Sequence, residues 1–211
     1  MHKEILSKKQ LELFRVVEDF SKQGFYLAGG TALALQLGHR ESIDFDLFRF
    51  QGFNNGLFDK YFTKNWKDTK VTKSIDVLDE YTIFLNDTKI TFLCYPFELD
   101  KINKIEEISM ASPLDIAAMK AYALGRRGKW KDYVDLYFLL QSYEMDEILL
   151  KSKEIFKSLF SEKLFLQQLC YFNDVDFSET IIWKIKNPPT ETTIKNFLIE
   201  QATKKEKTTP Y

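Results

Sequence analysis

The stretch from Phe25 to Phe50 constrains the fold more than any other part of the chain. It opens with a short apolar run and stops at the pair Gly29-Gly30, after which small and apolar residues are typical of a short helix. Gly38 ends that helix, and a second apolar run follows from Ile43 to Phe48. The pattern predicts a strand, a glycine turn, a helix and a second strand in quick succession.

Two aspartates interrupt the second predicted strand. Side chains alternate between the faces of a strand, so Asp44 and Asp46 share one face. The other face takes the apolar residues Ile43, Phe45 and Leu47. Neighbouring carboxylates repel each other and lose hydration, and a divalent cation relieves both costs. Mg²⁺ suits the pair best, because it binds one or two protein carboxylates together with the phosphate oxygens of a substrate.

The glycine pair adds a second chemical feature to the same stretch. Gly29 and Gly30 stand directly before the predicted helix, where backbone N–H groups are free to bind phosphate with help from the helix dipole. The stretch therefore predicts a phosphate cradle and a metal site that are joined by a short helix.

This combination resembles a known signature. Gly29-Gly30-Thr31, twelve intervening residues and then Asp44-Phe45-Asp46 are similar to the motif of polymerase-β-type nucleotidyltransferases. The longer string GGTALALQLGHR-ESIDFDLF resembles the AbiEii/AbiGii nucleotidyltransferases, the toxin halves of bacterial abortive-infection toxin–antitoxin pairs. The resemblance implies a Mg²⁺-dependent enzyme that moves a nucleotide from an NTP to an acceptor, either RNA such as tRNA or a protein. It also implies a cognate antitoxin protein as a partner.

The resemblance implies a role for each residue of the stretch. The β- and γ-phosphates would be held by Gly29, Gly30 and Thr31. Mg²⁺ would lie between the triphosphate and the carboxylates of Asp44 and Asp46. Two roles remain open for Arg40, which either reaches a phosphate or forms an ion pair with Asp46.

A second segment, SPLDIAAMKAYALGRRGKWKDYVDLYFLL, resembles the second conserved block of the family. By this resemblance, Lys120 contacts the nucleotide, and Asp132 or Asp135 faces the cleft from one side of a helix. A basic cluster would line an access route for phosphate or RNA, or would form a solvated loop: Arg126, Arg127, Lys129 and Lys131.

One feature departs from the family pattern. Polymerase-β-type transferases carry a third carboxylate on a neighbouring strand, but residues 89–95 contain no Asp or Glu. Thr91 or Leu93 is expected on the relevant face, and Asp76, Asp132 or Asp135 are the alternative carboxylates. The chain is therefore an active transferase, a catalytically degenerate nucleotide-binding protein, or a transferase that modifies a small molecule such as an antibiotic.

Outside these segments the hydrophobic pattern predicts further elements. Ser7 and Gln10 form a capping box, which predicts a first helix that ends near Gly24. Ser112 before Pro113 is a strong start signal for a later helix. The other predictions are a short helix at 57–62, strands at 71–78, 81–85 and 89–95, helices at 113–125 and 131–140, and two or three more helices within 145–172 and 180–200.

The expected fold class is α+β, with a small mixed β-sheet nucleotidyltransferase core and packed helices, followed by a C-terminal helical bundle. The predicted domains are residues 1–108 and 109–211. The net charge of −1 gives no global sign of nucleic-acid binding, so contact with a polyanion would need a local patch. No apolar run approaches ~20 residues and the N-terminus lacks an apolar signal segment, so we expect a cytoplasmic protein that does not contact membranes.

Overall fold

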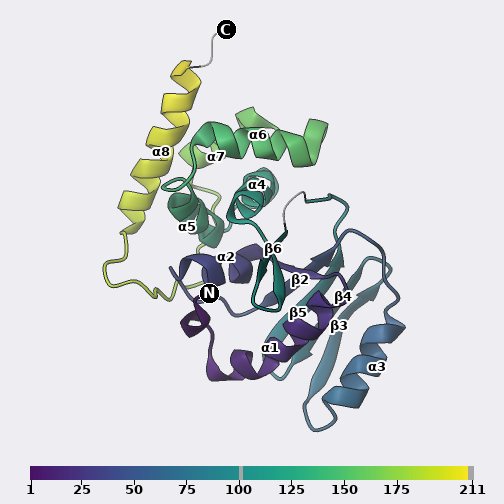
Figure 1. Cartoon of the computed structure of the whole chain (residues 1–211). Coiled ribbons are helices and arrows are strands. Elements are labelled where there is room, and N and C mark those ends of the chain that lie inside the picture. The colour runs from purple at the N-terminus through teal and green to yellow at the C-terminus, as the bar shows by residue number, and fades with distance from the viewer. Residues whose placement is uncertain (100–101, 209–211) are drawn as a thin grey trace. The chain divides into compact units, whose positions relative to one another are not determined.

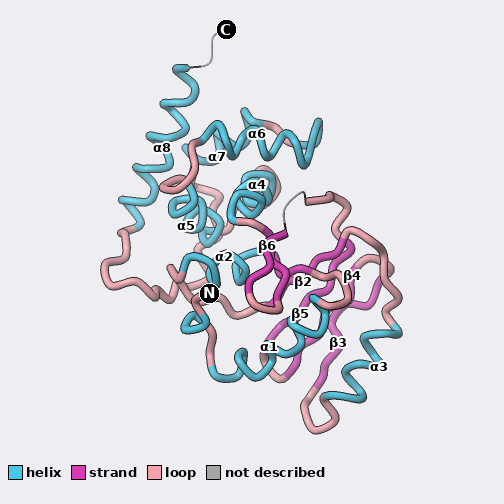
Figure 2. Tube along the Cα trace, in the orientation of Figure 1, coloured by secondary structure: helices cyan, strands magenta, loops and turns pink. Residues whose placement is uncertain are grey.

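The computed structural model describes residues 1–99 and 102–208. The chain divides into two compact units, Met1–Ala111 and Ser112–Tyr211. The expected domain boundary lay after residue 108, but residues 109–111 belong to strand β7 (Ile108–Ala111), which pairs within the first unit. All strands of the described residues lie in the first unit, and the second unit is helical (Figure 2).

The first unit is built on a seven-stranded mixed sheet. Its strands are β1 (Tyr26–Ala28), β2 (Phe45–Arg49), β3 (Val71–Val77), β4 (Glu80–Leu85), β5 (Thr88–Cys94), β6 (Ile102–Ile105) and β7. Their order is β3-β4-β5-β2-β1-β7-β6. Strand β2 pairs antiparallel with β1 and parallel with β5, which places the predicted metal strand at the centre of the sheet (Figure 1).

Four helical segments complete the first unit: a 3₁₀ turn (Lys3–Ile5), α1 (Lys8–Ser21), α2 (Gly29–Leu37) and α3 (Gly56–Asn65). The predicted capping box is present, because the Ser7 side chain accepts from the backbone N–H of Gln10 and the Gln10 side chain accepts from that of Ser7.

An aromatic core packs helices α1 and α3 against one face of the sheet. The ring centroid of Phe92 on β5 lies 4.5 Å from that of Phe20 on α1 and 4.4 Å from that of Phe58 on α3. Phe92 is paired with Leu47 on β2, and both side chains are fully buried. Asp46 precedes Leu47, so its side chain lies on the opposite face of the sheet.

The strand predictions were wrong at Ile43 and did not include two of the strands. Ile43 was assigned to the apolar face of the second strand, but that strand begins at Phe45 and Ile43 is 58% exposed. Strands β6 and β7 were not predicted at all. Each has only four residues and β6 reads Ile-Asn-Lys-Ile, so neither shows the sustained alternation that identifies a strand.

The second unit contains helices α4 (Pro113–Leu124), α5 (Trp130–Leu139), α6 (Met145–Phe156), α7 (Glu162–Cys170) and α8 (Glu191–Thr208), with a 3₁₀ turn at Lys157–Leu159. Helix α4 starts as predicted, because the Ser112 hydroxyl accepts from the backbone N–H of Asp115 at 3.1 Å and Pro113 occupies the first turn. Within the described residues, no helix has the length and apolar character needed to span a membrane.

Candidate active site

The glycine turn meets the predicted metal strand directly in the first unit, and it is the first turn of α2 instead of a separate turn before the helix. Strand β1 ends at Ala28, which is paired with Asp46 on β2. Gly29 follows with a φ of 65°, in the left-handed region that favours glycine. A Cβ atom built on Gly29 would lie 2.9 Å from Oδ2 of Asp46. The carboxylate therefore lies against the backbone of the turn, and a side chain at this position would displace it.

The N-terminus of α2 carries positive charge. Its N-cap residue, Ala28, has no side chain that can cap the helix, so the first backbone N–H groups are not bound by a capping side chain. A Cβ atom built on Gly30 would lie 2.7 Å from Nη2 of Arg40, whose side chain is buried. A guanidinium beside a helix N-terminus favours an anion there, because the charge and the dipole act together. Both predicted roles of Arg40 fit this position.

Thr31 has a contact that the sequence did not reveal. Its buried hydroxyl donates to the backbone carbonyl of Asp44, and the Ser42 hydroxyl lies 2.7 Å from it. A hydroxyl has one proton to donate, so the predicted donation to phosphate competes with the bond to Asp44. Thr31 and Ser42 together tie α2 to the segment that leads into β2.

The two aspartates suit a hard divalent cation. Asp44 directly precedes β2, Asp46 lies within it, and both side chains are half-buried. In the described ranges no group of three or more His, Cys, Asp or Glu residues is placed to hold a metal. One or two carboxylates are the protein ligands that Mg²⁺ uses when the oxygens of a substrate phosphate complete its coordination shell. The residues present therefore fit such an ion.

Thr91 lies beside Asp46, on the face where Thr91 or Leu93 was expected. In the parallel pairing of β2 with β5, Thr91 is the partner of Asp46, so both side chains lie on the same face. Thr91 is buried, and its hydroxyl lies 3.4 Å from that of Thr82 on β4. The strand on which the resemblance implies a third carboxylate thus presents a hydroxyl beside Asp46.

The sheet register argues against Asp76 and Glu80 as replacements for the third carboxylate. Asp76 was a predicted substitute, but it is paired with Tyr81 and lies on the face opposite Asp46, bound to Lys73 at 2.7 Å. Glu80 was missed because the predicted strand started one residue later. It lies on the same face as Thr82 and accepts from the Thr82 hydroxyl at 2.8 Å. Strand β4 is two strands from β2, about 10 Å away, so Glu80 cannot share a metal with Asp46.

Lys120, Asp132 and Asp135 form a buried cluster in the second unit. Nζ of Lys120 lies 2.7 Å from Oδ1 of Asp132 and 2.6 Å from Oδ2 of Asp135. The three side chains are 8% exposed or less, so Lys120 is a buried lysine. Asp132 and Asp135 share one face of α5, as their spacing predicted. Oδ2 of Asp132 is buried without a hydrogen bond, and Nε of Arg127 lies 3.9 Å from it.

Most of the predicted basic cluster is engaged inside the second unit. Lys129 lies 2.7 Å from Glu179, and Lys131 also pairs with this carboxylate. The two lysines hold the pKa of Glu179 down to about 2 by hydrogen bonding and charge. Arg126 stacks on the Tyr122 ring at 3.5 Å and donates to backbone carbonyls. Arg126 and Arg127 are both exposed, and the Arg127 side chain is 62% exposed.

Comparison with known proteins gives the family that the sequence motifs resemble. A sequence model described as the nucleotidyl transferase AbiEii toxin of a type IV toxin–antitoxin system matches residues 12–206. An uncharacterized protein of Aquifex aeolicus (strain VF5) is 37% identical over 181 residues, which cover 80% of this chain and 84% of that protein.

Two solved structures share the fold. JHP933 from Helicobacter pylori has a TM-score of 0.57 and 20% identity, covering 96% of this chain and 94% of its own. MenT4, a nucleotidyltransferase toxin from Mycobacterium tuberculosis, has a TM-score of 0.54 and 11% identity, covering 84% and 74%. These likenesses confirm the predicted fold class. Since the family model spans nearly the whole sequence, this chain belongs to the AbiEii family of nucleotidyl transferase toxins.

Proposed function

We propose that this protein is a Mg²⁺-dependent transferase that moves a nucleotide from an NTP to an RNA acceptor. The observation that supports it most is the contact between the glycine turn and the carboxylate, in which Gly29 leaves only enough room for Oδ2 of Asp46. A phosphate bound at the N-terminus of α2 lies beside the two aspartates. Family membership adds an NTP substrate and an antitoxin partner.

In this proposal the residues of the first unit bind and orient the triphosphate. The backbone N–H groups of Gly29 and Gly30 hold non-bridging oxygens, and Arg40 offsets their negative charge. Asp44 and Asp46 would hold Mg²⁺, which when bound neutralises charge on the triphosphate. The acceptor hydroxyl oxygen forms a bond to the α-phosphorus, the bond from that phosphorus to the bridging oxygen breaks, and pyrophosphate leaves with the electron pair.

The proton of the acceptor hydroxyl needs a destination. The residue of β5 beside Asp46 is Thr91, so this strand offers no carboxylate that could accept the proton. In the proposal the proton therefore passes to water. The proposal therefore includes slow turnover. Contact of Lys120 with the nucleotide stays a prediction, and so does a role for Asp132 or Asp135.

Label transfer tests the proposal. The purified protein is incubated with Mg²⁺, each α-labelled NTP in turn and total bacterial tRNA, beside an Asp44→Ala/Asp46→Ala variant. We expect label in RNA with the wild type and none with the variant, and the NTP that gives this label is the nucleotide that the enzyme uses. Label that is removed by protease and resists ribonuclease assigns a protein acceptor instead. Both NTPs and tRNA are cytoplasmic, so we place the protein in that compartment.

A second candidate, a nucleotide-binding protein without catalysis, is favoured by one observation. Thr91 replaces the carboxylate that would complete the metal site and act as base. This candidate predicts that an NTP binds and protects the protein against thermal unfolding, while no label reaches RNA, protein or an aminoglycoside offered as a small-molecule acceptor.

A further inference from the structure

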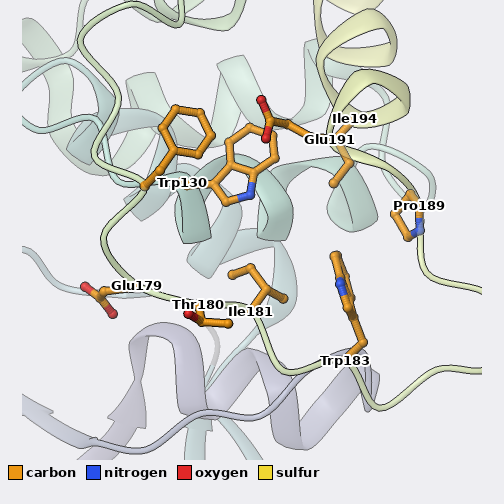
Figure 3. Close-up of a pocket in the computed structure, with 9 residues that line it drawn as sticks. Trp130, Glu179, Thr180, Ile181, Trp183, Pro189, Glu191 and Ile194 are labelled. Atoms are coloured by element: carbon orange, nitrogen blue, oxygen red, sulfur yellow. The ribbon is translucent and has the colours of Figure 1, made fainter.

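A small pocket opens in the second unit between the start of α5, the start of α8 and the segment that joins α7 to α8 (Figure 3). Its volume is about 260 Å³, below the range of about 300–1,000 Å³ that is usual for drug-sized ligands. Its lining includes Trp130, Trp183, Ile181, Pro189 and Ile194. The pocket is therefore sized for one flat ring system and offers aromatic and aliphatic surfaces to it.

Trp130 presents a hydrogen-bond donor to this space. Its side chain is only 8% exposed, and the edge of the indole that bears the nitrogen faces the open space above Ile181 and beside Trp183 (Figure 3). Among the residues that the structure describes, this N–H has no acceptor. An N–H group at the surface of a pocket, with no acceptor among the described residues, favours a guest with a hydrogen-bond acceptor.

The charges around the pocket disfavour a cationic guest. Glu179 is paired with Lys129 and Lys131, and Glu191 is paired with Lys195 at 2.5 Å. Three lysines against two glutamates leave a formal charge of +1.

An internal cation already occupies the nearby aromatic faces, since Nζ of Lys195 lies 5.8 Å from the ring of Trp130 and 5.0 Å from that of Phe177. Further positive charge follows Trp183, because Lys184 and Lys186 are exposed. An aromatic pocket surrounded by lysines is the usual composition of a site for single-stranded nucleic acid.

We propose that this pocket binds one unpaired base of a single-stranded RNA segment. The base stacks on Trp183, a carbonyl or ring nitrogen of the base accepts from the indole N–H of Trp130, and the exposed lysines contact the flanking phosphates. The identification of this RNA as the acceptor rests on the proposed function; the binding itself does not.

Binding of a labelled oligoribonucleotide tests the pocket without any transfer reaction. The probe is a single strand of about eight nucleotides, within the site sizes known for single-strand binders, and the buffer contains EDTA and no NTP. We expect Trp183→Leu to raise the Kd about fivefold or more, because it keeps an apolar side chain and removes the stacking face. Trp183→Phe restores a ring and most of the affinity. Trp130→Phe keeps the ring, removes the N–H and raises the Kd about two- to tenfold.

The control variant is Trp66→Leu. Trp66 is a half-buried tryptophan of the first unit that does not line the pocket, so its replacement leaves the Kd within about twofold. The same strand annealed to its complement should bind more weakly than the single strand. Equal affinity of the wild type and Trp183→Leu overturns the proposal, as does the absence of any binding to the single strand. Binding of an arginine-rich peptide that depends on Trp183, without RNA binding, overturns it in favour of a protein partner.

The two proposals fail in different ways. RNA binding that depends on Trp183, in a protein that transfers no label, supports the pocket and contradicts the transferase. If the wild type transfers label to RNA, and Trp183→Leu binds RNA and transfers label as the wild type does, the result supports the transferase and contradicts the pocket.

Discussion

Gly29 and Asp46 are in contact, since a Cβ atom on the glycine would lie 2.9 Å from Oδ2 of the aspartate. Gly29 is the first residue of α2 and Asp46 lies on β2, and the pairing of β1 with β2 brings them together. The turn that we propose binds phosphate and the strand that we propose binds Mg²⁺ are therefore in direct contact.

Gly29→Ala should inactivate the transferase with a modest loss of stability. The new methyl group displaces the Asp46 carboxylate, and a displacement of about 1 Å costs about 100-fold in rate. The left-handed backbone adds roughly 1–2 kcal/mol of strain. Label transfer measures the first effect and urea unfolding the second. Gly52→Ala is the matched control, because nothing lies within 4 Å of a Cβ there, and similar activity of both variants would contradict the geometry.

Thr91→Asp should accelerate transfer. It places a carboxylate next to Asp46 on the same face, where it can complete the metal site and accept the proton of the acceptor. General-base catalysis contributes about 100-fold or more, so we expect a gain toward that size in initial rate. Thr82→Asp puts the same charge one strand farther away and should give no gain. A rate that Thr91→Asp leaves unchanged would show that a missing carboxylate does not limit the reaction.

Lys120→Met should destabilise the second unit by about 3–5 kcal/mol. The substitution leaves Asp132 and Asp135 buried without their shared cation. In a Trp66→Phe background, the two remaining tryptophans both lie in the second unit, so denaturation followed by fluorescence reports on that unit. Adding Asp132→Asn and Asp135→Asn should recover part of the loss. If Lys120→Met lowered the free energy of unfolding by less than about 1 kcal/mol, the cluster would contribute no more than an exposed ion pair does, which would contradict this prediction.

Glu179→Gln should lower stability in a pH-dependent manner. Two lysines depress the pKa of Glu179 from 4.5 to about 2, so its contribution is fully present above pH 4.5 and is lost as the pH falls toward 2. The Glu179 side chain is 37% exposed, so solvent screening limits the effect to about 1 kcal/mol. Urea unfolding of wild type and variant at pH 6, 4 and 3 should show the difference shrinking with acid. A difference that is constant with pH would rule out the ion pairs as its source.

The sequence predicted those elements whose signals are local. The capping box at Ser7 and the start of α4 at Ser112 depend on neighbouring residues, and the structure has both. Gly29 and Gly30 were predicted to form a turn before the helix, but they are its first two residues. Strands β6 and β7 could not be predicted, because four residues are too few for a periodic pattern and their pairing partners lie elsewhere in the sheet.

The sequence identified the residues of the candidate site but not the contacts between them. Nothing local shows that the Thr31 hydroxyl bonds the carbonyl of Asp44, or that Arg40 lies beside Gly30. The pairing of Lys129 with Glu179 spans 50 residues, so a basic run in the sequence is largely neutralised in the fold. The Trp130 pocket likewise combines segments that the sequence separates, and no single segment contains its pattern.

The most direct test of the account compares label transfer by the wild type, Asp46→Asn and Asp76→Asn at saturating Mg²⁺ and NTP. Asp46 lies against the glycine turn, whereas Asp76 lies on the opposite face of the sheet in an exposed pair with Lys73. We predict that Asp46→Asn lowers the initial rate by about 100-fold or more and that Asp76→Asn stays within about twofold of the wild type. Equal rates for the wild type and Asp46→Asn would contradict a transfer site at this carboxylate.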